Sequence, residues 1–388
     1  MKLKYINSLK GICCLIVFTG HMISLLMPYV YFGETYPMHT ATEESLFKTP
    51  LNLFFNAPSA LMCFLLLSGF LVPLSAFKTD QGNVLVNWWK RYLRLMPMVV
   101  IGCVLGWLVM KAGLVYSLKA IDITYAKNYT EWFNNFEPGK LIEKNGPIYD
   151  GMIGSFLDRS LYNAPLGTIK FIWINSFVLL IINKFCSKLK VRYIIYGILI
   201  CLSYMSGRLQ YENFYVGIML LGMLLCDVFY NPLSSGKRLP VPMGIICMIA
   251  GVYLASVPKG SPGNGIYSWI VTLPITHYLY WAIGWSFIVI AIESVSGIRR
   301  FLENRVFLWL GDVSFAIFAV HWPVVVSVVS CAFLLGLLKI NGMSYAGACC
   351  LVVTVTIAIV IGVSWIVQNK IYKYLCKFVN RIVEKLEK

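Results

Sequence analysis

The stretch Leu9–His21, LKGICCLIVFTGH, opens the first long apolar segment and carries an ionisable residue near each end. Lys10 and His21 are eleven residues apart, so on a helix that turns about 100° per residue they share one face. A rise of about 1.5 Å per residue separates them by about 16 Å. If the segment spans a bilayer, Lys10 lies at the water boundary and His21 near the middle. An ionisable side chain at that depth marks either a functional site or an imidazole that a neighbouring helix satisfies.

The composition of the chain favours a membrane location for this segment. Of its 388 residues, 59% are hydrophobic and 13% are charged, and the mean hydropathy is +0.72. A soluble domain has about 25% charged residues, so this chain would expose a large apolar surface in water. The sequence therefore predicts an all-α integral membrane protein, a polytopic bundle of transmembrane helices. Because no long polar segment remains for a second domain, we expect one transmembrane domain over residues 1–367.

Ten apolar segments approach the roughly 20 residues that a membrane span needs. They are Leu9–Phe32, Leu51–Phe77, Leu95–Tyr116, Leu166–Phe185, Val191–Met205, Phe214–Tyr230, Val241–Val257, Ile266–Val295, Phe307–Leu338 and Ser344–Val367. With the N-terminus in the cytoplasm, 22 of the 33 Lys and Arg residues fall in cytoplasmic segments. This excess of cytoplasmic cations is the one that membrane proteins show. We therefore expect ten spans with both termini cytoplasmic.

Two segments outside the predicted spans are long enough to consider. Residues 117–165 form the largest outer loop, whose aromatic and amide side chains suit either sugar binding or a cap on the lipid headgroups. Residues 368–388 repeat apolar side chains at helical spacing between lysines and arginines, which predicts a basic amphipathic tail in the cytoplasmic interface.

Charge and cysteine content exclude some classes of function. The net charge is +16, but the cations lie mainly in short loops between apolar segments. This distribution favours attraction to anionic lipid over nucleic-acid binding. The twelve cysteines lie in or beside apolar segments, without a CxxC pair, and are expected to be small apolar side chains rather than disulfides or metal ligands.

A second candidate cluster is KRYLRLMP, residues 90–97, at the cytoplasmic start of the third predicted span. Arg91 and Arg94 are three residues apart and share a helix face. Two guanidinium groups suit the binding of phosphates. They are equally typical of arginines that only set membrane topology.

A third candidate cluster is GDVSFAIFAVHWP, residues 311–323. Ser314 and His321 lie two turns apart on one helix face, and His321 is the second histidine predicted within the membrane. Pro323 follows and is able to open the helix. Of the other histidines, His277 is expected to be structural, and His39 in an outer loop is assigned no role.

Taken together, these residues resemble the acyltransferase-3 family of integral membrane acyltransferases. The matching positions are Lys10 and His21 in the first span, the run Phe64–Phe70 with Ser68 in the second, Arg91, Arg94 and Pro97 in the third, the glycine- and methionine-containing segment Phe214–Leu224, and Gly311, Ser314, Phe315 and His321 late in the chain. They occur in the order typical of the family. Two positions depart from it, since Lys10 replaces the usual arginine and Leu166–Ile172, LGTIKFI, lacks the tryptophan and glutamate of the fourth span.

The resemblance implies an O-acetyltransferase that moves an acyl group, here expected to be acetyl, from cytoplasmic acetyl-CoA to a hydroxyl of an extracytoplasmic glycan or glycolipid. It implies that Lys10, Arg91, Arg94 and Ser68 contact the donor. His21 would act as general base, and His321 and Ser314 would orient the acceptor or stabilise developing charge. No metal is implied, and the bacterial inner membrane is the expected location.

Two other functions remain compatible with the sequence. A transporter or flippase for a glycan or lipid intermediate would use the same polar groups within the membrane, although we find no internal repeat of the kind common in transporters. An inactive family member would account for the tryptophan and glutamate missing from Leu166–Ile172, whereas His21, Arg91, Arg94 and His321 are all retained.

Overall fold

The computed structural model describes residues 3–76, 83–127, 146–260, 265–271, 276–339 and 343–386. All regular structure in these ranges is helical, which confirms the predicted all-α class. The α-helices are α1 (Lys4–Leu26), α2 (Pro28–Phe32), α3 (Thr42–Lys48), α4 (Ala57–Ala76), α5 (Val84–Lys111), α6 (Ser117–Thr124), α9 (Pro147–Tyr149), α10 (Ser155–Leu157), α11 (Ile169–Cys186), α12 (Arg192–Gly207), α13 (Phe214–Tyr230), α14 (Val241–Ala255), α15 (Ser268–Val271), α16 (His277–Ser294), α17 (Ser296–Leu302), α18 (Arg305–Val324), α19 (Ser330–Lys339), α20 (Tyr345–Ile366) and α21 (Lys373–Leu386). Short 3-10 or π segments are η1 (Gly33–Thr35), η2 (Pro50–Phe55), η3 (Asp150–Gly154), η4 (Ala164–Thr168), η5 (Tyr211–Asn213), η6 (Val325–Val329) and η7 (Val367–Tyr372).

Helix length limits how many of the ten predicted segments can span a membrane. Each segment contains a helix, but α12, α13 and α14 have only 16, 17 and 15 residues. Six helical stretches in the described part of the chain are long and apolar enough to cross, and α16 with α17, bent by 102°, would make a seventh. The structure therefore supports six to seven spans by length. The count of ten and the cytoplasmic location of both termini stay predictions.

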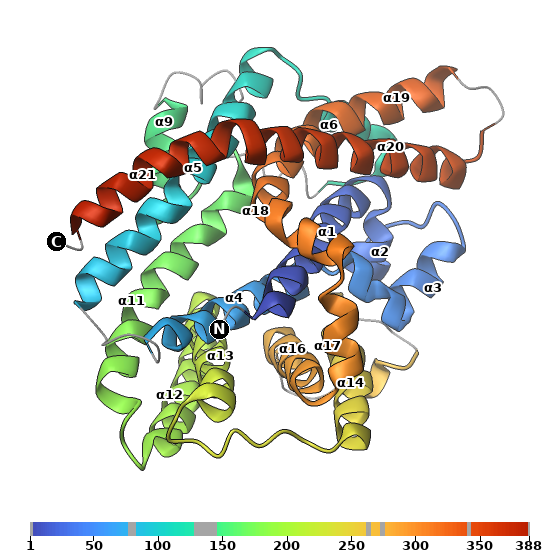
Figure 1. Cartoon of the computed structure of the whole chain (residues 1–388). Coiled ribbons are helices and arrows are strands. Elements are labelled where there is room, and N and C mark those ends of the chain that lie inside the picture. Colours follow the sequence, from blue (N-terminus) through green and yellow to red (C-terminus); the bar gives the residue numbers. More distant parts are fainter. Residues whose placement is uncertain are drawn as a thin grey trace.

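Helix α1 lies at the centre of the bundle (Figure 1) and packs against α4 and α18. Its contact with α18 is close, because a Cβ added at Gly11 would lie 2.7 Å from the Gly311 nitrogen. Helices α4 and α13 meet in the same way, since a Cβ at Gly69 would overlap the Met219 carbonyl. Apolar helices in a bilayer associate through such small residues, which let their backbones approach. The glycines of the sequence motifs thus set helix packing.

A proline lies near the end of α18, where the helix continues into the π segment η6. Pro323 has no N–H, so the carbonyl four residues earlier, on Ala319, loses its helical partner. The buried side chain of Asn163 replaces it, because its Nδ2 donates to the Ala319 oxygen at 2.8 Å and to the Gly102 oxygen at 3.2 Å. His321 lies in the turn that this amide supports.

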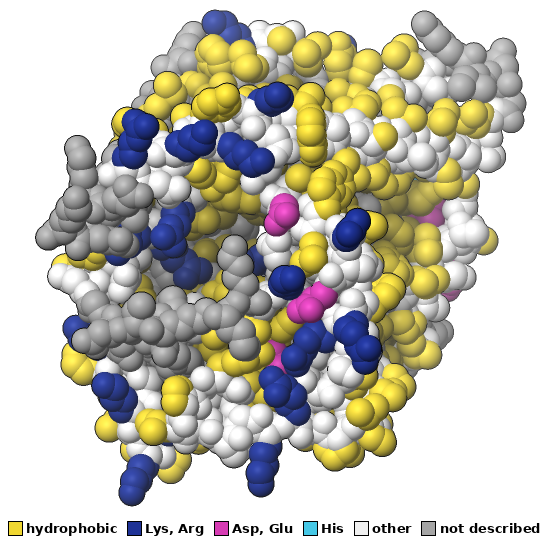
Figure 2. Space-filling view, viewed as in Figure 1, with side chains coloured by type: hydrophobic (Ala, Val, Ile, Leu, Met, Phe, Trp, Pro, Cys, Tyr) yellow, Lys and Arg dark blue, Asp and Glu magenta, His cyan; other side chains and the backbone are white. Residues whose placement is uncertain are grey.

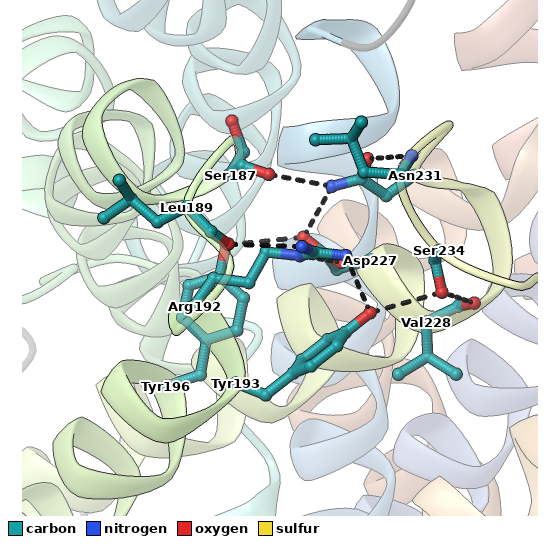
Figure 3. Close-up of polar contacts among 10 residues, drawn as sticks. Ser187, Leu189, Arg192, Tyr193, Tyr196, Asp227, Val228, Asn231 and Ser234 are labelled. Carbon is teal, nitrogen blue, oxygen red and sulfur yellow. Dashed lines mark hydrogen bonds and ion pairs between the residues drawn. The ribbon is translucent and has the colours of Figure 1, made fainter.

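A buried ion pair joins α12 to α13 (Figure 3). The Arg192 Nε donates to Asp227 Oδ1 at 2.8 Å, and Asn231 Nδ2 donates to Asp227 Oδ2 at 2.9 Å. Arg192 also donates to the Leu189 carbonyl at 3.2 Å and to the Tyr193 hydroxyl at 3.0 Å. Arg192 is 5% exposed, although arginine is rarely buried without a partner.

Figure 2 shows Lys and Arg side chains gathered over one face of the molecule, with few Asp or Glu side chains in view. Both chain ends lie within the same view in Figure 1. Helix α20 continues through η7 into α21, which packs against α5, so the predicted basic tail is joined to the bundle. Of the predicted outer loop, residues 128–145 lie outside the described ranges.

Candidate active site

Two adjoining cavities open between the central helices. The first, of about 450 Å³, is called here the histidine cavity because His21 and His277 line it together with Tyr31, Tyr278 and Trp281. The second, of about 330 Å³, is called the lysine–arginine cavity, and its lining includes Lys10, Ser68, Arg91, Ser314 and Tyr372. The two cavities share the side chains of Leu61, Thr168 and Phe318. Molecules bound in the two cavities would thus meet at this shared wall.

The structure brings together the two histidines that the sequence places 300 residues apart. His21 on α1 and His321 on α18 stack with ring centroids 5.3 Å apart and an angle of 17° between their planes. Trp322 packs edge-on against His21 at 5.6 Å. His21 lines the histidine cavity, whereas His321 is completely buried behind it.

The hydrogen bond of His321 fixes how its ring is protonated. Its Nδ1 lies 3.1 Å from the Ile317 carbonyl, which can only accept, so Nδ1 carries the hydrogen. The neutral ring then has its lone pair on Nε2, which is buried and has no hydrogen-bond partner among the described residues. Two charged imidazoles in one stack would repel each other, so the stack disfavours protonation of both rings at once.

The lysine–arginine cavity combines two cations with no acidic lining residue in the described part of the chain. Lys10 lies on α1 and Arg91 on α5. The Nη2 of Arg91 donates a hydrogen bond to the Ser68 hydroxyl on α4. The Ser314 hydroxyl, from α18, donates to the Gly311 carbonyl at 2.7 Å. A cavity that carries positive charge without a carboxylate suits an anionic ligand.

The two arginines of the predicted pair, Arg91 and Arg94, point in different directions in the structure. Arg91 lines the cavity, whereas Arg94 is exposed and is not one of its lining residues. Tyr372, which does line the cavity, donates its hydroxyl hydrogen to the Arg94 carbonyl at 3.1 Å. Two residues three positions apart differ in direction by about 60° on a helix, which is enough for one to face the cavity and the other to turn away.

The departure in the fourth predicted span also falls in this site. Thr168 belongs to the wall between the cavities, and Ile172, which stands where the family has a glutamate, lines the lysine–arginine cavity. The replacement of that acid by isoleucine leaves Lys10 and Arg91 as the charged groups lining the cavity in the described part of the chain.

Two residues of the site are not indicated by any sequence motif. His277, expected to be structural, lines the histidine cavity, and its Nε2 has no hydrogen-bond partner among the described residues. Lys259 lines the same cavity from the segment that follows α14. Neither residue stands in a motif, and only the tertiary fold brings them to the cavity. All twelve cysteines are free thiols, and no cluster of three metal-ligand side chains occurs among the residues described.

A family model described as an acyltransferase domain matches residues 3–363. No curated protein and no solved structure matches the chain. The family match covers nearly the whole chain and includes the cavity-lining residues Lys10, His21 and Arg91, together with His321. The chain therefore belongs to the acyltransferase-3 family and is a multi-pass membrane acyltransferase.

Proposed function

We propose that the protein transfers an acetyl group from cytoplasmic acetyl-CoA to a hydroxyl of an extracytoplasmic glycan or glycolipid, and that it does so in the bacterial inner membrane. The observation that carries the proposal is the shared wall of Leu61, Thr168 and Phe318. It separates a cavity with two cations from a cavity that His21 lines. A donor and an acceptor bound in these cavities would approach each other from opposite sides.

The donor is assigned to the lysine–arginine cavity because its charges suit the phosphates of CoA. Lys10 and Arg91 would contact those phosphates, and the bond from Arg91 to Ser68 would hold the guanidinium in place. Ser314 would lie beside the acyl end, since it lines the same cavity as Phe318 of the shared wall. Arg94 would contact only those parts of CoA that extend beyond the cavity.

His21 is assigned the role of general base. A neutral imidazole accepts the proton of the acceptor hydroxyl while the hydroxyl oxygen bonds to the thioester carbonyl carbon. The bond from carbon to sulfur then breaks, and the leaving CoA thiolate takes up a proton. His321 would orient His21 through the stack and accept a hydrogen bond at Nε2.

The test is transfer of labelled acetyl from acetyl-CoA to cell-envelope glycan by the purified protein. General base catalysis contributes about 10²–10⁴-fold, so we expect His21→Ala to lose that much transfer. The variant should still be stabilised against heating by acetyl-CoA, because His21 lies outside the lysine–arginine cavity. His39→Gln is the matched control, since His39 lines neither cavity.

Full transfer by His21→Ala would remove His21 from the mechanism. A protein stabilised by the glycan but not by acetyl-CoA would instead be the transporter that the sequence left open.

A further inference from the structure

Lys259 gives the histidine cavity a charge that the transfer reaction itself does not require. Among the described residues that line this cavity, Lys259 is the only Lys or Arg, and there is no Asp or Glu. Its Nζ lies 5.6 Å from the centroid of the Phe32 ring. A cation over an aromatic ring is weakly stabilised and stays available to an anion.

Hydrogen bonds anchor the two residues Ser256 and Val257 shortly before Lys259. The Val257 carbonyl accepts hydrogen bonds from Asn56 Nδ2 at 2.9 Å and from Trp281 Nε1 at 2.8 Å. Ser256 and Tyr267 share a hydrogen bond of 2.7 Å between their hydroxyls. Anchoring the backbone two residues before Lys259 reduces the freedom that is lost when a ligand binds there, which favours recognition.

Lys259 is an exposed residue that also lines the cavity. Desolvation by the neighbouring protein lowers the pKa of its ammonium. A ligand anion beside the ammonium would offset this desolvation. His277 lines the same cavity, interacts electrostatically with Lys259, and has an Nε2 without a hydrogen-bond partner in the described structure.

We propose that the acceptor carries a single negative charge, and that Lys259 and His277 bind this group while the hydroxyl to be acetylated lies at His21. The inference rests on the proposed function and adds the chemical class of the acceptor. One ammonium without a second cation matches a monoanion, either the carboxylate of an acidic sugar or a phosphodiester. Tyr31, Tyr278 and Trp281 line the same cavity and would contact the sugar ring.

The test measures equilibrium binding of three probes to the full-length protein in detergent. The probes are methyl glucuronide, a methyl phosphodiester of glucose and the neutral methyl glucoside. We expect a charged probe to bind about tenfold more tightly than the neutral one, as one charge-assisted hydrogen bond provides. The tighter of the two charged probes identifies the anionic group.

Variants of Lys259 test whether this residue causes the preference for a charged probe over the neutral one. Lys259→Gln should bind charged and neutral probes equally, and Lys259→Arg should keep the preference. Lys111→Gln is the matched control, because Lys111 also lies over an aromatic ring, 4.7 Å from the Trp107 centroid, but lines neither cavity. If Lys259→Gln does not fold, the preference of the wild type must shrink as salt is added.

Equal binding of all probes, no binding of any probe, a preference that survives Lys259→Gln, or one that salt does not change would each overturn the inference. Failure of the proposed function looks different. It would appear as absence of acetyl transfer, or as transfer unaffected by His21→Ala, whatever the probes do.

Discussion

The Arg192–Asp227 pair and the lysine–arginine cavity both keep a guanidinium inside the bundle, but they satisfy it differently. Arg192 meets a carboxylate, which other buried side chains also contact. Arg91 donates to the neutral Ser68 hydroxyl, in a cavity whose described lining has no acid. A buried cation with its own carboxylate holds the fold together, whereas one that faces an acid-free cavity is placed to receive a ligand anion.

The largest expected effect tests the structural side of this comparison. Asp227→Ala leaves Arg192 buried without its carboxylate, so the free energy of unfolding should fall by about 3–5 kcal/mol. Denaturant unfolding in mixed micelles measures it. The double variant Arg192→Met with Asp227→Leu removes both charges and should lose less. Unchanged stability of Asp227→Ala would mean that the pair does not hold α12 to α13.

The next effect tests the binding side. Arg91→Gln removes a charge-assisted contact with the donor, so the affinity for acetyl-CoA should fall by about 10–100-fold, and less so at high salt. The unfolding free energy should change little, because no carboxylate of the described residues pairs with Arg91. A titration of acetyl-CoA against the purified protein measures the affinity.

Arg94→Gln is the control for this experiment, since Arg94 is exposed and outside the cavity lining. A smaller loss of affinity than in Arg91→Gln is expected. An equal loss would show that the donor phosphates extend past the cavity to Arg94.

The smallest effect concerns Asn163, whose amide hydrogen-bonds the turn of α18 that precedes Pro323. Asn163→Leu leaves the Ala319 and Gly102 carbonyls without the amide, so the unfolding free energy should fall by about 1–2 kcal/mol. Asn369→Leu is a matched control, because the Asn369 amide donates to the Trp365 carbonyl on an exposed helix surface. Equal stability of the two variants would contradict the role of Asn163.

The sequence predicted those parts of the site that depend on one helix at a time. The shared face of Lys10 and His21 follows from helix geometry, and the apolar runs predict the helices themselves. The His21–His321 stack joins α1 to α18 across 300 residues, so a local sequence pattern cannot predict it. For the same reason Lys259 and His277 became site residues only in the folded structure. The number of spans stays a prediction, because hydropathy does not show that the helices α12, α13 and α14 are shorter than a membrane span needs.

The contacts between α1 and α18 have a consequence for topology. Gly11 meets Gly311 and, ten residues further along each helix, His21 meets His321, so the two helices run in the same direction. If both cross the membrane, the chain between them must cross an odd number of times. The long helices α4, α5 and α11 satisfy this parity, and the bent pair α16 and α17 alone would break it. If α12, α13 and α14 cross as well, the number of crossings between α1 and α18 is odd again. The bent pair can therefore cross only if short helices cross with it.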